Sequence, residues 1–344
     1  MMPSIYSVGA CTAVGLSAEQ TAFGLRAGMF CPRTIGHADK RGEQLGAVLV
    51  PAIHEEIEGW ERLVSLALPA LREVLGPLGG RGRVGRIFLA LPEVRAGHSA
   101  DDHTRVIDEL ADAELDGDQR LFTKVVGDRE AFATALVAAK EYLDANRDAI
   151  VLVGAVDSYH DLRTYRALDD DYRILSERAP NGFIPGEASA FVALGGRVNG
   201  LTALSQLAFV NVGSEPSEDD VLAEVWTQLS RKAVRAATGA LESRGEAAGA
   251  PWILVDQTME RHRNKAWQMV LHRLRDHFDP ESTVQGTLAE KLGDVGAASG
   301  AILAIHATIG LASGFAPGSS ALVALASDRT ARSTFSLVTP KRSA

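Results

Sequence analysis

The chain has 344 residues, of which 46% are hydrophobic, and it carries a formal net charge of −9 with a pI near 5.5. That hydrophobic content supplies a sizeable core for one large domain or two ordinary ones. No Lys/Arg cluster rises above the acidic background, which argues against non-specific binding to nucleic acid or to an anionic membrane.

The two cysteines, Cys11 and Cys31, show no spacing typical of a metal site, so we expect a reducing compartment, the cytoplasm, and neither a metal nor another cofactor. No charged segment precedes the first apolar run, and no apolar stretch of about 18 residues is free of both charge and glycine. We therefore expect neither a signal peptide nor a membrane span.

The first third of the chain alternates between apolar runs of strand length and amphipathic segments of helix length. Ser17 is placed to cap the first helix, and Pro69 falls inside the second, where it is expected to produce a kink. Strands are expected at 4–8, 44–50 and 86–91, and helices at 17–27, 57–75 and 104–111.

The stretch 123–158 reads without interruption as strand, tight turn, helix and strand. Apolar residues fall almost all round the helix over 131–143, so both of its sides are expected to be buried. The run 150–156, IVLVGAV, has no polar alternation, which is typical of a parallel strand covered on both faces. Asp128, in the turn, is expected to cap the helix.

A second Gly-Asp turn, Gly293-Asp294, precedes another helix of small and apolar residues about half a chain later. This repetition predicts a duplicated α/β unit in which the two apolar helices pack at the interface. We place the halves at 1–198 and 199–344, with the joint at Asn199-Gly200. The second half is expected to contain strands at 204–212, 252–256, 283–287 and 320–327, helices at 219–242 and 264–278, and an edge strand at 335–338.

Five segments, in order along the chain, resemble β-ketoacyl synthases of the thiolase superfamily. They are SVGACTAVGLSAEQTAFGLRAG near the N-terminus, IVLVGAVDS at 150–158, NGFIPGEASAFVALG at 181–195, EKLGDVGAASGAILAI at 290–305 and GSSALVALA at 318–326. The third is similar to the family's DGFV-GEGAG segment and is the most specific match. The resemblance implies a duplicated βαβαβαββ fold in five layers, αβαβα.

The resemblance also locates the family's catalytic positions, which are a Cys at the start of the first buried helix and two His residues. The corresponding segments here are 126–130, without Cys, Ser or Thr; 257–261, QTMER; and Asp294. A carboxylate cannot form an acyl thioester or donate to an oxyanion. We therefore expect a catalytically inactive relative, a pseudoenzyme, with a vestigial pocket formed by Asp128, Phe183, Glu187, Gln257, Glu260, Arg261 and Asp294.

Other interpretations of these residues remain open. Asp128 and Asp294 are also ordinary helix caps, Phe183 is either a gate or plain core, and Glu187 has a structural role in holding loops. Four consecutive ionisable residues, 260–263, cannot all be buried, since an unpaired buried charge costs several kcal/mol. We expect Glu260 to pair with Arg261 or Arg263, and the segment to close the substrate tunnel together with Phe183.

Three functions remain open. The first is a scaffold, adaptor or chaperone-like partner, as in the bacterial ketosynthase-like proteins associated with type VI secretion effector loading, which this chain resembles. The second is a chain-length-factor-like subunit of a polyketide or fatty-acid ketosynthase. The third is an acyltransferase with a repurposed site using Glu260, His262 and Asp294. We expect a homodimer or heterodimer through the apolar strand at 122–126, with a secretion component or a ketosynthase as the partner protein.

Overall fold

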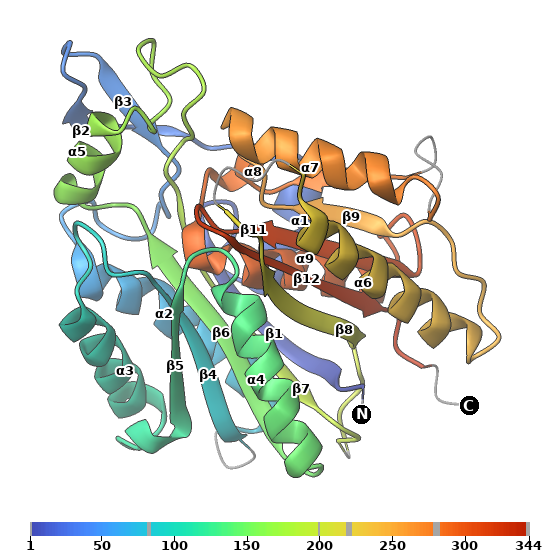
Figure 1. Cartoon of the computed structure of the whole chain (residues 1–344). Helices are drawn as coiled ribbons and strands as arrows, with labels where there is room; N and C mark the ends of the chain where they lie inside the picture. Colours follow the sequence, from blue (N-terminus) through green and yellow to red (C-terminus); the bar gives the residue numbers. More distant parts are fainter. Residues whose placement is uncertain (1, 81–83, 199, 218–221, 278–282, 342–344) are drawn as a thin grey trace.

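The computed structural model describes residues 2–80, 84–198, 200–217, 222–277 and 283–341. Its centre is a ten-stranded sheet in the order β10-β9-β11-β12-β8-β1-β7-β6-β4-β5. The strands are β1 (Ser4–Thr12), β4 (Val84–Pro92), β5 (Phe122–Gly127), β6 (Ile150–Ser158), β7 (Glu187–Gly195), β8 (Ser205–Ser214), β9 (Trp252–Val255), β10 (Gln285–Thr287), β11 (Ser320–Ala326) and β12 (Ala331–Val338). Figure 1 shows how they are arranged.

The sheet consists of two halves with the same topology. In the first, β4 is parallel to β5 and β6, and β7 is antiparallel to β6 and β1. In the second, β9 is parallel to β10 and β11, and β12 is antiparallel to β11 and β8. The halves join where β1 pairs with β8 at Ser4↔Gln206 and Ile5↔Ser205. The duplicated unit expected from the two Gly-Asp turns is therefore confirmed, while the proposed joint at Asn199 lies outside the described residues.

The two halves of the sheet form two layers, and the helices form three layers that alternate with them. Those described are α1 (Ala18–Arg26), α2 (Gly59–Leu75), α3 (Ala100–Glu114), α4 (Ala131–Ala145), α5 (Leu162–Asp170), α6 (Glu224–Glu242), α7 (Arg261–Leu274), α8 (Ala289–Leu292) and α9 (Ser299–Ser313), with short 3-10 turns η1 (Gly76–Leu78), η3 (Gln119–Leu121) and η4 (Gly296–Ala298). One core lies between the sheet and α2–α3, one between the sheet and α6–α7, and the largest around α1, α4 and α9. The architecture is the αβαβα arrangement of thiolase-like proteins.

The two central helices differ in burial. α9 is buried from Ser299 to Leu311, as expected. By length and composition the stretch Gly296–Ser313 could cross a membrane, but 89% of it is buried inside the protein, so it is a core helix. The expectation for α4 was wrong, because Thr134 and Glu141 are exposed in the single chain. α4 packs on β4 and β6 and against β8, β12 and α9, and the polar side that carries Thr134 and Glu141 stays exposed.

Several local expectations also need correction. Residues 33–47 form a hairpin, β2 (Arg33–Ala38) and β3 (Gln44–Ala47), where one strand was expected at 44–50, and an additional helix, α5, follows β6. Together these elements make a lobe at the upper left of Figure 1. β12 is not an edge strand, because it lies between β11 and β8. Asp128 does not cap α4: the residue at that position is Glu130, and its side chain makes no cap hydrogen bond.

Candidate functional site

Arg129 occupies the junction of β5 and α4, the position of the nucleophile turn in the family that this chain resembles. Its side chain has no exposed surface. Its Nε donates to Asp294 Oδ1 at 3.2 Å and its Nη2 to Asp294 Oδ2, while Nη1 donates to Asp128 Oδ2 and Asp328 Oδ1, both at 2.8 Å. Arg129 therefore ties the start of α4 to the Gly-Asp turn of the other half.

Two further arginines extend this arrangement. Arg263 donates to Asp256 Oδ2 at 2.9 Å and to Asp294 Oδ2 at 3.4 Å. Arg173 bridges Glu260, at 2.9 and 3.1 Å, and Asp328, at 2.6 Å. We refer to these residues together as the ionic cluster: Asp128, Arg129, Arg173, Asp256, Glu260, Arg263, Asp294 and Asp328.

The ionic cluster contains three arginines and five carboxyl groups, so full ionisation would leave buried negative charge uncompensated. Burial disfavours the charged form of these carboxyl groups more than any other single effect. Burial, with Asp328 nearby, raises the pKa of Asp128 to about 7, and burial raises that of Asp256. Burial acts in the same direction on Asp294, but Arg129 and Arg263 outweigh it and hold its pKa below 3.8. Protonation of Asp128, which its raised pKa favours, would relieve part of this charge excess.

The turn that carries Asp294 is fixed by backbone geometry. Gly293 has φ +69°, and a Cβ there would lie 2.5 Å from the carbonyl oxygen of Ile184. Asp294 Oδ1 accepts from the Gly296 N–H at 2.9 Å, so the carboxylate also caps η4. Only glycine fits this position, which makes the orientation of Asp294 a property of the fold.

A second buried ion pair lies behind the ionic cluster. Arg62 and Glu187 have no exposed side-chain surface and form two hydrogen bonds, of 2.5 and 2.8 Å. Glu187 also accepts from the Val50 N–H at 2.7 Å and the Ser158 hydroxyl at 2.8 Å. This carboxylate therefore joins α2, β6, β7 and the segment after β3, in line with the structural role considered for it.

The segment 260–263 contains two buried and two exposed ionisable side chains, as expected from the cost of burying an unpaired charge. Glu260 and Arg263 are buried, with 3.9 Å between the carboxylate and the guanidinium, whereas Arg261 and His262 are exposed. Arg261 donates to Asn181 Oδ1 at 3.1 Å. Of the two pairings expected for Glu260, the structure contains the one with Arg263, and Arg173 is its closer partner.

A pocket of about 270 Å³ remains in front of Phe183. The expectation that 260–263 and Phe183 leave no opening is therefore only partly right. The residues of the ionic cluster do not line this pocket, so it ends before reaching them. Its walls are formed by Phe30, Phe183, Ile184, Gln257, Thr258, Met259, Asn264, Thr287, Ala289 and Glu290.

Of the residues expected in the vestigial pocket, Asp128, Glu260 and Asp294 belong to the ionic cluster, which also contains Arg129 and Asp328, two residues not expected there. A signal for Arg129 was present: a cation just before the N-terminus of a buried helix opposes the helix dipole and needs carboxylate partners. Asp328 follows β11 and had no local signal, since only the pairing of the two halves brings it next to Arg129.

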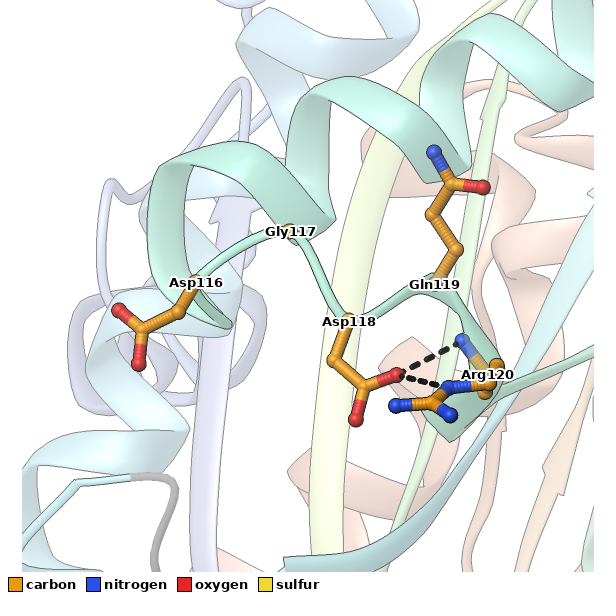
Figure 2. A pocket seen from close by; sticks show the side chains of 5 residues that line it. All are labelled: Asp116, Gly117, Asp118, Gln119 and Arg120. Atoms are coloured by element: carbon orange, nitrogen blue, oxygen red, sulfur yellow. Dashed lines mark hydrogen bonds and ion pairs between the residues drawn. The ribbon is translucent and has the colours of Figure 1, made fainter.

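Two other groups of polar side chains have the residue types of a metal site. Glu260, His262 and Asp328 have ligand atoms within 4.8 Å of one another, but Arg173 already binds both carboxylates. An open pocket of about 400 Å³ lies at the end of α3. Figure 2 shows Asp118 there, and its carboxylate accepts from the backbone N–H and the Nε of Arg120. Neither arrangement supports a metal site.

The cysteines lie away from the start of α4. Cys11 is on β1, is 2% exposed and packs in the core beneath α2. Burial, followed by the charges of Glu187 and Glu73, raises the pKa of its thiol to about 12, so the reactive thiolate is scarce at neutral pH. Cys31 is an exposed loop residue.

Comparison with known proteins finds no matching family model and no matching curated relative by sequence. Solved structures of similar fold include the ishigamide ketosynthase/chain length factor (17% identity, TM-score 0.72, 98% of this chain and 99% of that chain). Another is a type II polyketide synthase acyl-carrier protein in complex with its ketosynthase bound to the hexaketide (12%, 0.75, 99% of both chains). A third is a β-ketoacyl synthase from Burkholderia phymatum (13%, 0.68, 99% and 100%). The chain therefore has the ketosynthase fold.

Proposed function

We propose that this protein is a non-condensing, ketosynthase-like subunit that acts by binding a second protein, in the manner of a chain length factor. The observation that carries the proposal is the ionic cluster at the junction of β5 and α4. Arg129 fills this junction and is saturated by three carboxylates. The cluster contains no thiol, and the imidazole beside Glu260 and Asp328, that of His262, is exposed. The junction therefore lacks the nucleophile that acyl transfer through a thioester requires.

The surface suited to a partner is formed by β5 and α4. β5 ends the sheet, and α4 carries a partly exposed outer side next to it. Apolar residues contribute on both elements, among them Val125, Val126 and Ala138. An apolar edge strand that stays unpaired is an aggregation hazard. Since two of the similar structures contain a ketosynthase with a chain length factor or carrier protein, we propose a ketosynthase as the partner, in the cytoplasm.

Incubation with an acyl-CoA is expected to leave the protein unmodified, because Cys11 is buried with a raised thiol pKa and no nucleophile lies at the start of α4. Intact-mass spectrometry followed by peptide mapping makes the measurement, with an active ketosynthase as positive control. A stable acyl adduct on either cysteine, Cys11 or the exposed Cys31, would show that the protein takes part in acyl transfer and would overturn the proposal.

Val125→Lys is expected to reduce the amount of partner that co-purifies from the native host by about tenfold or more, since each 1.4 kcal/mol of lost binding is a factor of ten. The new ammonium group would lie on the apolar face of β5, the face that packs against α4. Tyr172→Lys, at a 56% exposed position on the distant lobe, is the matched control. Quantitative mass spectrometry of the purified complexes reads the result, and equal recovery with both variants would place the interface elsewhere.

A second candidate is an adaptor for a different class of protein, such as a type VI secretion effector. The observation favouring it is the short connection between β4 and β5, which contains only α3 and η3 as helices. The family that this chain resembles usually carries a larger capping and dimer-contact insertion there. The identity of the co-purified protein separates the two, because a ketosynthase supports the first candidate and a secretion component the second.

The repurposed-acyltransferase interpretation receives less support. Glu260 and Asp294 are both bound by arginine side chains, and His262 is exposed on the outer side of the segment. A general base must reach its substrate without a competing guanidinium. These three side chains therefore do not converge on a common open space.

A further inference from the structure

The free edge of β5 carries one charged side chain. β5 pairs with β4 along one side, and no described strand pairs with the other. Lys124 lies in the middle of the strand, is exposed, and has no ion-pair partner among the described residues. Val126, two residues on and therefore on the same face, is 45% exposed. In Figure 1 this edge lies at the left of the sheet, beside α3.

Pairing β5 with its own copy would bring two lysines together. A two-fold axis makes the paired strands antiparallel, and directly opposed residues then lie on the same face. In one of the two registers that pair nearly the whole strand, Lys124 faces Lys124 of the copy. In the other, Val125 faces itself and the two lysines are diagonal neighbours, about 7–8 Å apart. Like charges so placed are destabilising.

A buried imidazole on α3 lies within electrostatic reach of Lys124. His103 on α3 is 1% exposed, and neither of its ring nitrogens has a hydrogen-bond partner in the part of the chain that the structure describes. Burial and then the Lys124 ammonium lower the pKa of His103, and His98 acts in the same direction. The lowered pKa favours the neutral imidazole, so His103 gives Lys124 no counter-charge, and Lys124 remains a cation at the β5 edge.

We propose that β5 is a binding strand for a different chain, one whose edge strand places an acidic side chain opposite Lys124, and that Lys124 disfavours self-pairing. This inference rests on the proposed function, since it specifies the partner surface of that subunit. Opposite charges across an interface set the choice of partner, and like charges suppress the wrong one. A lysine on an edge strand is also a common protection against self-association.

The chain itself supplies a probe, because Lys124→Glu creates the acidic strand that the proposal requires. Wild-type protein alone and Lys124→Glu alone are expected to remain mainly monomeric, whereas an equimolar mixture forms a dimer at least about tenfold more tightly than either, with the preference weakening as salt rises. Lys232→Glu, the same charge change at an exposed position on α6, should not dimerise with wild type. Sedimentation equilibrium with one chain fluorescently labelled measures each constant.

A stable wild-type homodimer at the same concentration, or a mixture that associates no better than its components, would overturn the inference. Lys124→Gln adds an independent readout, since removing the repulsion should increase self-association relative to wild type. These results are separable from the proposed function. A wild-type homodimer would leave the non-condensing subunit in place, while an acyl adduct would remove that function whatever the mixing experiment gives.

Discussion

Asp294→Asn is expected to lower the free energy of unfolding by about 3–5 kcal/mol, the usual effect of removing one partner from a buried ion pair. Asp294 receives hydrogen bonds from Arg129 and Arg263. An amide in its place would remove the carboxylate that, among the described residues, these two arginines share, and would turn an N–H donor toward one of them. Urea denaturation at neutral pH, followed by circular dichroism and tryptophan fluorescence, measures the change.

Asp128→Asn is the matched control. The pKa of Asp128 is raised to about 7, chiefly by burial, so this carboxyl is already partly neutral at pH 7. Its Oδ2 accepts from Arg129 and from the Asp328 N–H at 2.7 Å, and an asparagine oxygen can accept both. The substitution should therefore cost much less than Asp294→Asn. Equal losses for the two variants would contradict the charge distribution described for the ionic cluster.

The two carboxyl groups also make opposite contributions to the pH dependence. A group with a lowered native pKa, such as Asp294, stabilises the fold above its unfolded value near 3.8 and loses that contribution as the pH falls. Asp128, with a raised pKa, stabilises it below 3.8 and loses that contribution as the pH rises through about 7. Between pH 4 and 7, wild type should lose stability relative to Asp128→Asn as the pH rises, which denaturation curves across that range can test.

Arg62→Met, made on its own, is expected to lower the free energy of unfolding by about 3–5 kcal/mol, because it leaves the Glu187 carboxylate buried without its counter-charge. The side chains of both residues are fully buried, and Glu187 holds the Val50 N–H as well. Adding Glu187→Gln to Arg62→Met should recover part of the loss, since a neutral amide can still accept from Val50. A double variant less stable than Arg62→Met would show that the charge of Glu187 is not the source of the penalty. Urea denaturation of wild type, Arg62→Met, Glu187→Gln and the double variant completes the double-mutant cycle.

Local patterns in the sequence were sufficient for much of the fold. The apolar run 150–156 and the all-round apolar helix after Gly293-Asp294 became a buried strand and a buried helix, because both have the same requirement for burial wherever they pack. The two Gly-Asp turns revealed the duplication, and the split of 260–263 into buried and exposed residues followed from the cost of desolvating a charge.

The exposed side of α4, the interior position of β12 and the ionic cluster were decided only by the tertiary structure. α4 contains charged residues that α9 lacks, Glu141 among them, but which side of α4 stays exposed depends on the elements that pack against it. Asp328 joins Arg129 across a separation of 199 residues, because the two halves of the sheet place the ends of β5 and β11 next to each other. Local sequence determines what a segment can bury, whereas the packing of distant segments determines which charges meet and which edge is left for a partner.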